Sequence, residues 1–298
     1  MPKNTEYIHY LMHIQRLDHI STAQFSIAVR HDTAPRHHNV WHYHEELELI
    51  NIKKGRGTFF VGDCIHQFSD KFFVLIGSNT PHYWLFDEEY ININENKSAD
   101  IRVIHFKPDY LGKDFLDLPE SASIRAVYTL ADRVLTFQDD DGDAFSKVFD
   151  EIMEQSPLNR LLTLSSLLNK IQRLTNSVLL MNSKYSKMPQ QDDYTRMNKI
   201  LDYIRFNYKI KIHLQEIAQI AGMSPNSFCR YFKQKTGKTL IQFVNELRIG
   251  QACKQLSETN ASIKEICFDC GFQNFVSFHK IFKSLTAVTP SMYRSNSK

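Results

Sequence analysis

The stretch LQEIAQIAGMSPNSFCRYFK, from Leu214 to Lys233, decides the fold of the C-terminal third of this chain. Its apolar residues recur at helical spacing on both sides of a glycine. Gly222 supplies the positive φ that ends the first helix, and Ser224-Pro225 is an N-cap followed by proline at the first helical position. The stretch therefore predicts two short helices joined by a tight turn.

A second copy of this unit follows as IKEICFDCGFQNFVSFHKIFK, from Ile263 to Lys283. Eight positions match, with one residue inserted in the second turn: Leu214, Ile217, Ala218 and Gly222 recur 49 positions later, and Ser227, Phe228, Phe232 and Lys233 recur 50 positions later. Ser262 and Glu265 form a capping box before the second copy. The small residues Ala218 and Cys267 allow two helices to cross closely. This packing role explains Cys267-x-x-Cys270 better than a zinc or redox site does, since no second cysteine pair is present.

The segment from Tyr194 to Lys298 is strongly basic. It holds 16 Lys and Arg residues against 6 Asp and Glu, a net charge of +10, whereas the other 193 residues carry 20 against 27, a net −7. A basic segment of this size is typical of a domain that binds a polyanion, although a solvated basic helix bundle has the same composition. The charge therefore favours nucleic acid as a partner.

The duplicated unit resembles the DNA-binding domain of the AraC/XylS family of bacterial transcription regulators. The matching features are IAGMSPNSFCRYFKQKTGKT, the joining segment NELRIGQACKQLSET, the second unit and the closing TPSMYR, which together cover about 100 residues. One departure is Ala287, where the family usually has Gly before Val-Thr-Pro. If this position needs a positive φ, the alanine costs about 1 kcal/mol. The resemblance implies an all-α domain with two helix-turn-helix units joined by a long helix.

The resemblance also implies which residues contact double-stranded DNA. The second helix of each unit is expected in a major groove, with its N-terminal half at the base edges, so that the two units occupy two successive grooves about one helical turn apart. Base contacts are expected from Asn226, Cys229 and Arg230 in the first unit and from Phe275, Val276, His279 and Lys280 in the second. Phosphate contacts are expected from Lys233, Lys235, Lys238, Arg248 and Lys283. Each lysine has the alternative of being a solvated surface residue.

Upstream of the basic domain, the sequence divides into zones with different periodicity. Short strand-like runs such as LELINI and FFVLIG fill residues 20–106, and helical spacing follows over 107–181. We expect an α+β two-domain protein, with a β-domain at 1–106, a helical connector and dimerisation region at 107–181, a polar linker at 182–193 and the DNA-binding domain at 194–298. The Leu-rich face of the connector has intramolecular packing as its alternative role.

The β zone contains WHYHEELELINIKKG, from Trp41 to Gly55. Residues i and i+2 of a strand share a face, so His42 and His44 can converge on one point, and Glu48 follows four residues later. The spacing resembles the first motif of cupin barrels, and Pro81-His82 resembles the second, although Arg36, Asn79 and Phe86 replace residues that cupins usually have. The resemblance implies a cupin-like β-barrel over about residues 20–106, which is also the sensor fold of many AraC-type regulators.

Three interpretations of this cluster stay open. His42, His44, Glu48 and His82 match the three-His, one-Glu shell that cupin enzymes use for Fe, Mn, Ni or Zn, so a divalent metal is one occupant. The same side chains, with Trp84, would otherwise hold a small polar effector such as a sugar. As a third alternative, backbone groups and carboxylates satisfy the histidines. His37 and His38 precede the strand and are expected at the surface.

The sequence as a whole predicts a cytoplasmic, sequence-specific transcription regulator and not an enzyme. We expect an activator that is controlled by a small molecule, with a homodimer and RNA polymerase as further partners. The alternative is a metal-dependent cupin enzyme fused to a DNA-binding domain. The five cysteines have no framework spacing and are expected to be reduced. No run of 18 apolar residues is present, so no membrane partner is expected.

Overall fold

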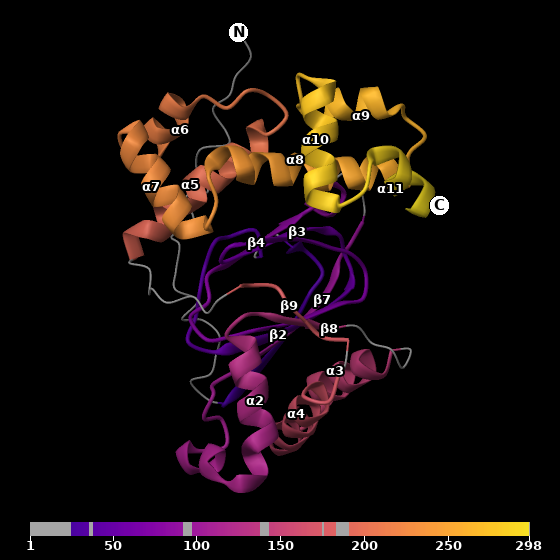
Figure 1. The fold of residues 1–298 in the computed structure, drawn as a ribbon. Helices are drawn as coiled ribbons and strands as arrows, with labels where there is room; N and C mark the ends of the chain where they lie inside the picture. The colour runs from indigo at the N-terminus through magenta and orange to yellow at the C-terminus, as the bar shows by residue number, and fades with distance from the viewer. Residues whose placement is uncertain are drawn as a thin grey trace.

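The computed structural model of the chain describes residues 25–35, 38–91, 97–137, 143–174, 176–182 and 191–297. A domain of two β-sheets with helices, here called the β-domain (27–182), precedes an all-helical domain, here called the helical domain (191–297), as Figure 1 shows. Most of the predicted linker at 182–193, like His37, lies outside the described residues.

The described strands form two antiparallel sheets. The larger sheet has the order β1-β7-β2-β5-β8-β9 and the smaller sheet the order β4-β3-β6. The strand bounds are β1 Ile27–Asp32, β2 Leu47–Lys54, β3 Gly57–Val61, β4 Cys64–Phe68, β5 Phe72–Ile76, β6 His82–Phe86, β7 Asp100–Phe106, β8 Leu135–Phe137 and β9 Val178–Leu179. Helix α1 (Glu88–Ile91) follows β6.

Both faces of the larger sheet are covered. On β2, Leu49 faces the helices and Ile50 faces the smaller sheet, and both are fully buried. The helix side is covered by α2 (Ala122–Ala131), α3 (Ala144–Glu154) and α4 (Pro157–Ile171). Successive side chains of β2 thus enter two separate cores, which is why every residue from Leu47 to Ile52 is buried, Glu48 and Asn51 included.

Two expectations about the β-domain need correction. The region 107–181 is not a separate helical connector, because β8 and β9 lie within it and extend the larger sheet, and its helices share a core with that sheet. It also contains the short 3₁₀ turns Lys113–Asp117 and Pro119–Ser121. The predicted cupin barrel is not confirmed, since the described strands form two facing sheets and not a closed barrel. An isolated antiparallel bridge joins His42, which precedes β2, to His82 at the start of β6.

The helical domain confirms the duplicated unit. Its helices are α5 Gln191–Asn207, α6 Leu214–Ile220, α7 Pro225–Thr236, α8 Leu240–Glu258, α9 Ile263–Asp269, α10 Phe275–Thr286 and α11 Pro290–Ser297. Gly222 and Gly271 have φ of +65° and +87°, as expected for the two turns. Cys267 and Cys270 are buried in the core of the second unit, in agreement with the packing interpretation of this pair.

The helical domain packs on the outer face of the smaller sheet (Figure 1). Phe60 of β3 stacks on Phe243 of α8 with ring centroids 5.0 Å apart and an interplanar angle of 18°. A Cβ on Gly250 would lie 2.2 Å from Gln67 Nε2, so glycine at this position leaves room for the Gln67 side chain between α8 and β4. Lys254 pairs with Asp87 at 2.6 Å at the border of this contact. The two domains therefore share one continuous interface.

Among the described residues, no helix is both long enough and apolar enough to cross a bilayer.

Candidate functional site

The first helix-turn-helix unit presents one exposed face on α7. Phe228 and Phe232 are fully buried and fix the rotation of the helix, and Ser224 caps it by accepting a hydrogen bond from the Ser227 backbone N–H. This rotation leaves the predicted contact residues at the surface, and they are Asn226, Cys229, Arg230 and Lys233. Lys235 and Lys238 are half-buried, and Lys238 pairs with Glu246 at 2.9 Å. The N-terminal part of α7 thus offers an amide, a thiol and a guanidinium on one face.

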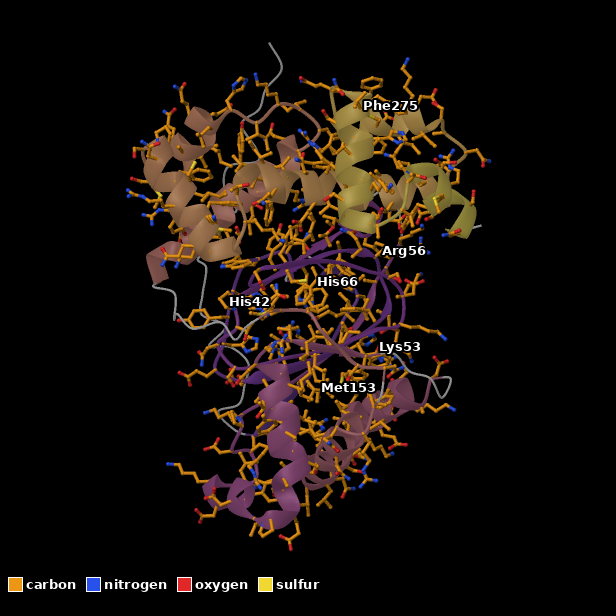
Figure 2. The ribbon with its side chains drawn as sticks, in the orientation of Figure 1. His42, Lys53, Arg56, His66, Met153 and Phe275 are labelled. Atoms are coloured by element: carbon orange, nitrogen blue, oxygen red, sulfur yellow. The ribbon has the colours of Figure 1, made fainter. Side chains whose placement is uncertain are left out.

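The second unit repeats this arrangement with different chemistry on α10. Phe278 and Phe282 are fully buried, while Val276 is 76% exposed and Phe275 is 38% exposed. Figure 2 shows Phe275 at the end of α10 that points away from the β-domain. The ring of His279 lies against Phe275, with centroids 4.5 Å apart. Lys280 and Lys283 are exposed on the same helix. The second unit therefore presents apolar groups and cations where the first presents Asn226 and Arg230.

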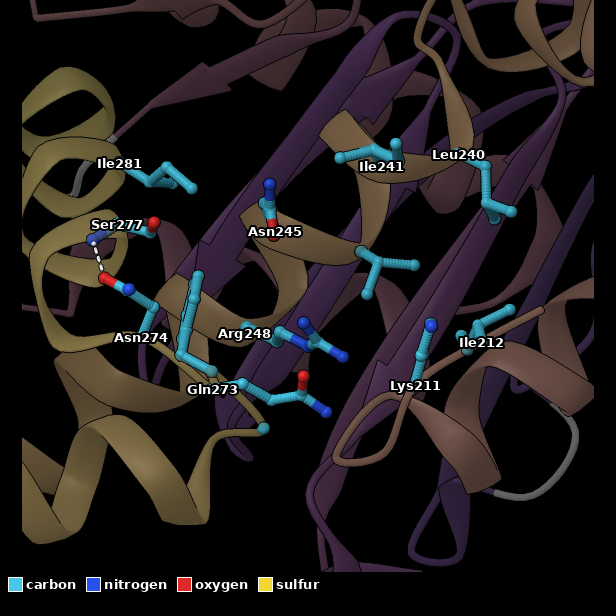
Figure 3. Close-up of a pocket in the computed structure, with 13 residues that line it drawn as sticks. Lys211, Ile212, Leu240, Ile241, Asn245, Arg248, Gln273, Asn274, Ser277 and Ile281 are labelled. Carbon is cyan, nitrogen blue, oxygen red and sulfur yellow. Dashed lines mark hydrogen bonds between the residues drawn. The ribbon is translucent and has the colours of Figure 1, made fainter. Parts of the chain in front are cut away.

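Helix α8 joins the two units and carries Arg248. The Arg248 guanidinium donates to the backbone carbonyls of Tyr208 and Ile210 at 2.6 and 2.8 Å and lies over the Phe272 ring. This differs from the phosphate contact that the sequence suggested, because these bonds tie α8 to the segment that follows α5. A groove of about 350 Å³ lies between the two units beside Arg248, with Lys211 on its rim and no acidic side chain among the described residues that line it (Figure 3).

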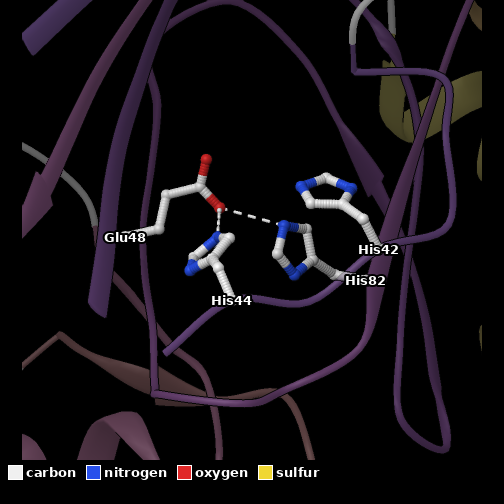
Figure 4. Close-up of side chains that lie close together, drawn as sticks. All are labelled: His42, His44, Glu48 and His82. Carbon is white, nitrogen blue, oxygen red and sulfur yellow. Dashed lines mark hydrogen bonds and ion pairs between the residues drawn. The ribbon is translucent and has the colours of Figure 1, made fainter. Parts of the chain in front are cut away.

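A second candidate site lies in the β-domain, where His42, His44, Glu48 and His82 converge as predicted (Figure 4). One potential ligand atom from each residue lies within 4.8 Å of the others, and all four side chains are buried. His82 Nε2 is 2.9 Å and His44 Nε2 is 3.3 Å from Glu48 Oε2. The chain pairing that builds the site is the His42–His82 bridge, which positions two histidines from segments 40 residues apart.

The orientation of the three imidazoles is fixed by backbone carbonyls. The Nδ1 atoms of His42, His44 and His82 lie 2.7, 3.0 and 2.9 Å from the carbonyl oxygens of Val40, Glu46 and Thr80. A carbonyl only accepts, so each Nδ1 carries a hydrogen, and in a neutral ring each Nε2 then presents a lone pair. The Nε2 atoms of His44 and His82 face the Glu48 carboxylate, which is itself only an acceptor. A proton or a cation among them relieves this repulsion, and metal-bound histidines are oriented in the same way.

The electrostatics of the cluster differ from residue to residue. Burial and the neighbouring His82 hold the pKa of His42 well below its usual value, so this ring is neutral at pH 7. Burial raises the pKa of Glu48, but the charges of His105 and His82 outweigh it and hold that pKa well below the usual range. Burial lowers the pKa of His44, but the hydrogen bond that the His44 ring donates to the Glu48 carboxylate outweighs this and leaves that pKa raised. An ionised carboxylate among imidazoles is a donor set that borderline metals prefer.

Sequence reasoning missed His105, which completes the surroundings of the cluster. His105 on β7 is the register partner of Glu48 on β2, and its Nε2 lies 3.2 Å from Glu48 Oε1. Burial lowers the pKa of His105 to about 4. The alternation in IRVIHF indicates that His105 shares a face with Val103, but it does not indicate that β7 pairs with β2 and so places His105 beside Glu48.

Two other expectations about the β-domain differ from the structure. Trp84 does not face a ligand space, because it is 1% exposed and stacks on Phe59 with centroids 3.9 Å apart in the core between the sheets. His38 was expected at the surface, but it is 2% exposed and lies 2.8 Å from Asp32 Oδ2. In both cases the indole or imidazole fills a space that only the folded sheets define.

Comparison with known proteins agrees with the geometry of the helical domain. Residues 217–296 match the model of a helix-turn-helix domain family. The chain is 35% identical over 112 residues to the bifunctional transcriptional activator/DNA repair enzyme AdaA of Bacillus subtilis, which is 38% of this chain and 52% of that protein. It is 30% identical over 99 residues, 33% of this chain, to the uncharacterized HTH-type transcriptional regulator YdeC of the same species. The aligned part spans about half of AdaA and 34% of YdeC.

Among solved structures, the chain is similar to ToxT from Vibrio cholerae O395. The similarity covers 91% of this chain and 97% of that one, with 16% sequence identity and a TM-score of 0.36.

Proposed function

This chain contains a helix-turn-helix domain of the AraC type, and from that premise we propose that the protein is a sequence-specific DNA-binding transcription regulator. The observation that carries the proposal is the pair of equivalent helices α7 and α10, each with a buried Phe pair behind it and an exposed N-terminal face. Helix α8 contributes residues to the cores behind both helices. Two fixed recognition helices suit two successive major grooves of one duplex.

Under this proposal the two units contribute unequally to sequence recognition. Arg230 can donate two hydrogen bonds to guanine and Asn226 can pair with adenine, each worth about 1–3 kcal/mol of discrimination. Phe275 and Val276 can contact thymine methyl groups only, so the second unit discriminates less. Lys233, Lys280 and Lys283 are exposed and assigned to phosphate. The groove beside Lys211 is where the duplex backbone would pass between the two major grooves.

The direct test is salt-dependent binding of the full-length protein to DNA. Fluorescence anisotropy with a random-sequence duplex at 50 to 200 mM salt should show log K falling linearly with log salt, with a slope of about −0.9 for each phosphate contact. A slope near zero, or no binding at 50 mM salt, would refute the proposal. Because Lys233→Ala removes one assigned phosphate contact, it should reduce the slope by about 1.

We further propose that the β-domain is the sensor of this regulator and that its buried cluster binds a divalent transition metal. The residues fit such an ion: three imidazole Nε2 atoms and one ionised carboxylate converge, and the Nδ1 atoms are held by carbonyls. His42, His44, Glu48 and His82 would hold it. A bound metal would supply Lewis acidity and a coordination site for a polar effector. A regulator needs differential binding between two states and no turnover.

The remaining assignments rest on the resemblance and, for the homodimer, on an exposed apolar face. We propose that the regulator is an activator, contacts RNA polymerase and acts as a homodimer, with the apolar side chains of Leu158 and Leu162 on α4 exposed for a partner copy. A metal-dependent enzyme is the second candidate, and the cluster is the observation that favours it. Product formation from a candidate substrate by the metal-loaded protein, lost in Glu48→Gln, would support the enzyme. Metal binding without turnover would support the sensor.

A further inference from the structure

The contact between the two domains includes a paired hydrogen bond between a side chain and the backbone. The Asn198 side chain of α5 accepts from the Trp41 backbone N–H at 2.7 Å through Oδ1 and donates to the Trp41 carbonyl at 3.1 Å through Nδ2. Asn198 is 7% exposed and Trp41 is 3% exposed. One amide thus satisfies both backbone groups of a residue 157 positions away in the sequence. Any other orientation of the Asn198 amide would leave the buried backbone N–H and carbonyl of Trp41 without partners. The cost of two unpaired buried groups therefore favours this one geometry.

Trp41 is the residue directly before the first histidine of the cluster. The His42 backbone N–H donates to the His82 carbonyl at 3.0 Å, and the His82 N–H donates back to the His42 carbonyl at 2.9 Å. The His44 carbonyl accepts from the Asn79 N–H at 2.7 Å. Between Trp41 and His44 the chain is therefore held by the Asn198 amide, the isolated His42–His82 bridge and the Asn79 N–H, and not by a continuous sheet ladder. Its side chains divide, with Trp41 in the core of the helical domain and His42 in the cluster.

The segment 41–44 connects the cluster directly to α5 of the helical domain, through the hydrogen bonds between Trp41 and Asn198. With an ion bound, the imidazoles of His42 and His44 would be held beside Glu48, and the backbone that carries Trp41 would be fixed with them. Fixing Trp41 favours one orientation of Asn198 and hence of α5. Helix α5 belongs to the core of the first helix-turn-helix unit through Met197, Ile200 and Ile204. A buried core transmits such a displacement because it is close-packed.

We infer that Asn198 is a positioning residue that couples occupancy of the His42–His44–Glu48–His82 cluster to the docking of the first helix-turn-helix unit. The inference rests on the proposed metal binding and goes beyond it by naming the residue and the backbone that link the two domains. Coupling of this kind is reciprocal, so a docked α5 also strengthens the hold of the cluster on its ion.

Hydrogen exchange of the full-length protein with and without one equivalent of Zn²⁺ tests the inference. In the wild type, Zn²⁺ should slow amide exchange both in residues 41–44 and in α5 around Asn198, by about tenfold. In Asn198→Ala, Zn²⁺ should still slow residues 41–44 but should leave α5 unchanged. The matched control is Asn207→Ala, because Asn207 lies on the same helix and bonds only to the Tyr203 carbonyl among the described contacts. It should respond like the wild type.

His44→Ala reports whether the ion acts through the cluster, since it removes a ligand and leaves both Trp41 hydrogen bonds in place. It should abolish the Zn²⁺ effect in both segments. The inference is overturned if α5 slows equally in Asn198→Ala and wild type, if α5 never responds, or if residues 41–44 show no Zn²⁺ protection at all. Anisotropy with duplex DNA on the same samples measures the proposed DNA-binding function separately, so failure of the coupling and failure of that function are distinguishable.

Discussion

Gly237 and Ala287 occupy equivalent positions 50 residues apart in the two units and have the same left-handed backbone, with φ of +69° and +64°. Each residue is the C-cap of its recognition helix. Glycine adopts this conformation at no steric cost, whereas alanine is strained there. Ala287, which departs from the family pattern, therefore adopts a left-handed backbone conformation that favours glycine.

We predict that Ala287→Gly stabilises the protein by about 0.5–1 kcal/mol, because it relieves the strain of a Cβ at positive φ. Denaturant unfolding measures this as a higher midpoint with an unchanged slope. The opposite exchange, Gly237→Ala, is the matched comparison and should destabilise by more than that, because the new Cβ would also lie 2.6 Å from Asp63 Cβ. A lower unfolding midpoint in Ala287→Gly would contradict the claim that the backbone is strained at Ala287.

The five cysteines should react very unequally with N-ethylmaleimide in the native protein. Cys229 is exposed on α7, whereas burial raises the pKa of Cys64 and Cys253 to about 11 and of Cys270 to about 12. The thiolate is the nucleophile, so at pH 7.5 these buried thiols stay protonated, and their labelling should rise only as the pH approaches those values. Mass spectrometry should find one modified residue at pH 7.5.

Bound DNA should protect Cys229 from this labelling, because the thiol lies on the face of α7 assigned to the major groove. The labelling rate with a saturating duplex should fall at least about fivefold, which corresponds to most of the protein being bound at about four times Kd. An unchanged rate at proven saturation would place α7 outside the groove.

Arg230→Ala and Lys233→Ala should separate base contact from phosphate contact. Arg230→Ala should lower the affinity for the preferred site by about 10–100-fold and leave random DNA nearly unaffected, since one bidentate pair is worth about 1–3 kcal/mol. Lys233→Ala should weaken both duplexes by a similar factor. Equal losses on both duplexes for Arg230→Ala would remove it from the base-contacting set.

Divalent metal should stabilise the protein through the buried cluster. At a Zn²⁺ concentration of about 100 times Kd, the unfolding free energy should increase by about 2.7 kcal/mol, measured by denaturant titration. Glu48→Gln and His82→Ala should lose this increment. His66→Gln is a suitable control, because His66 stacks on Phe72 outside the cluster and should keep the full increment. An equal increment in all three variants would place the ion elsewhere.

The helical domain was predictable from sequence because its signals are local. The Ser224 cap, the Ser262–Glu265 capping box and the turns at Gly222 and Gly271 each depend on residues within four positions, and all are present in the structure. The contact residues on α7 and α10 were implied by the resemblance to AraC/XylS regulators and not by periodicity. The structure confirms that the residues expected to contact bases are exposed, except for the half-buried His279, and their contacts with DNA stay predictions.

The β-domain was less predictable because its contacts join distant segments. The convergence of His42, His44 and Glu48 follows from strand alternation, but His105 reaches Glu48 through a register 57 positions apart. Strands β8 and β9 have three and two residues, too few for a periodicity to show. The positive charge of Arg248 suits a phosphate contact, yet its guanidinium donates to backbone carbonyls 40 and 38 positions away. Such partners exist only once the chain has folded.

The central claim is that one chain places two recognition helices in successive major grooves, and in vitro selection tests it most directly. The full-length protein should enrich, from a random duplex library, a two-part site whose halves are about 10 base pairs apart, with a guanine-containing half that Arg230→Ala no longer selects. Recovery of no enriched sequence, or of a single half-site whose selection is unchanged by Arg230→Ala, would contradict the account.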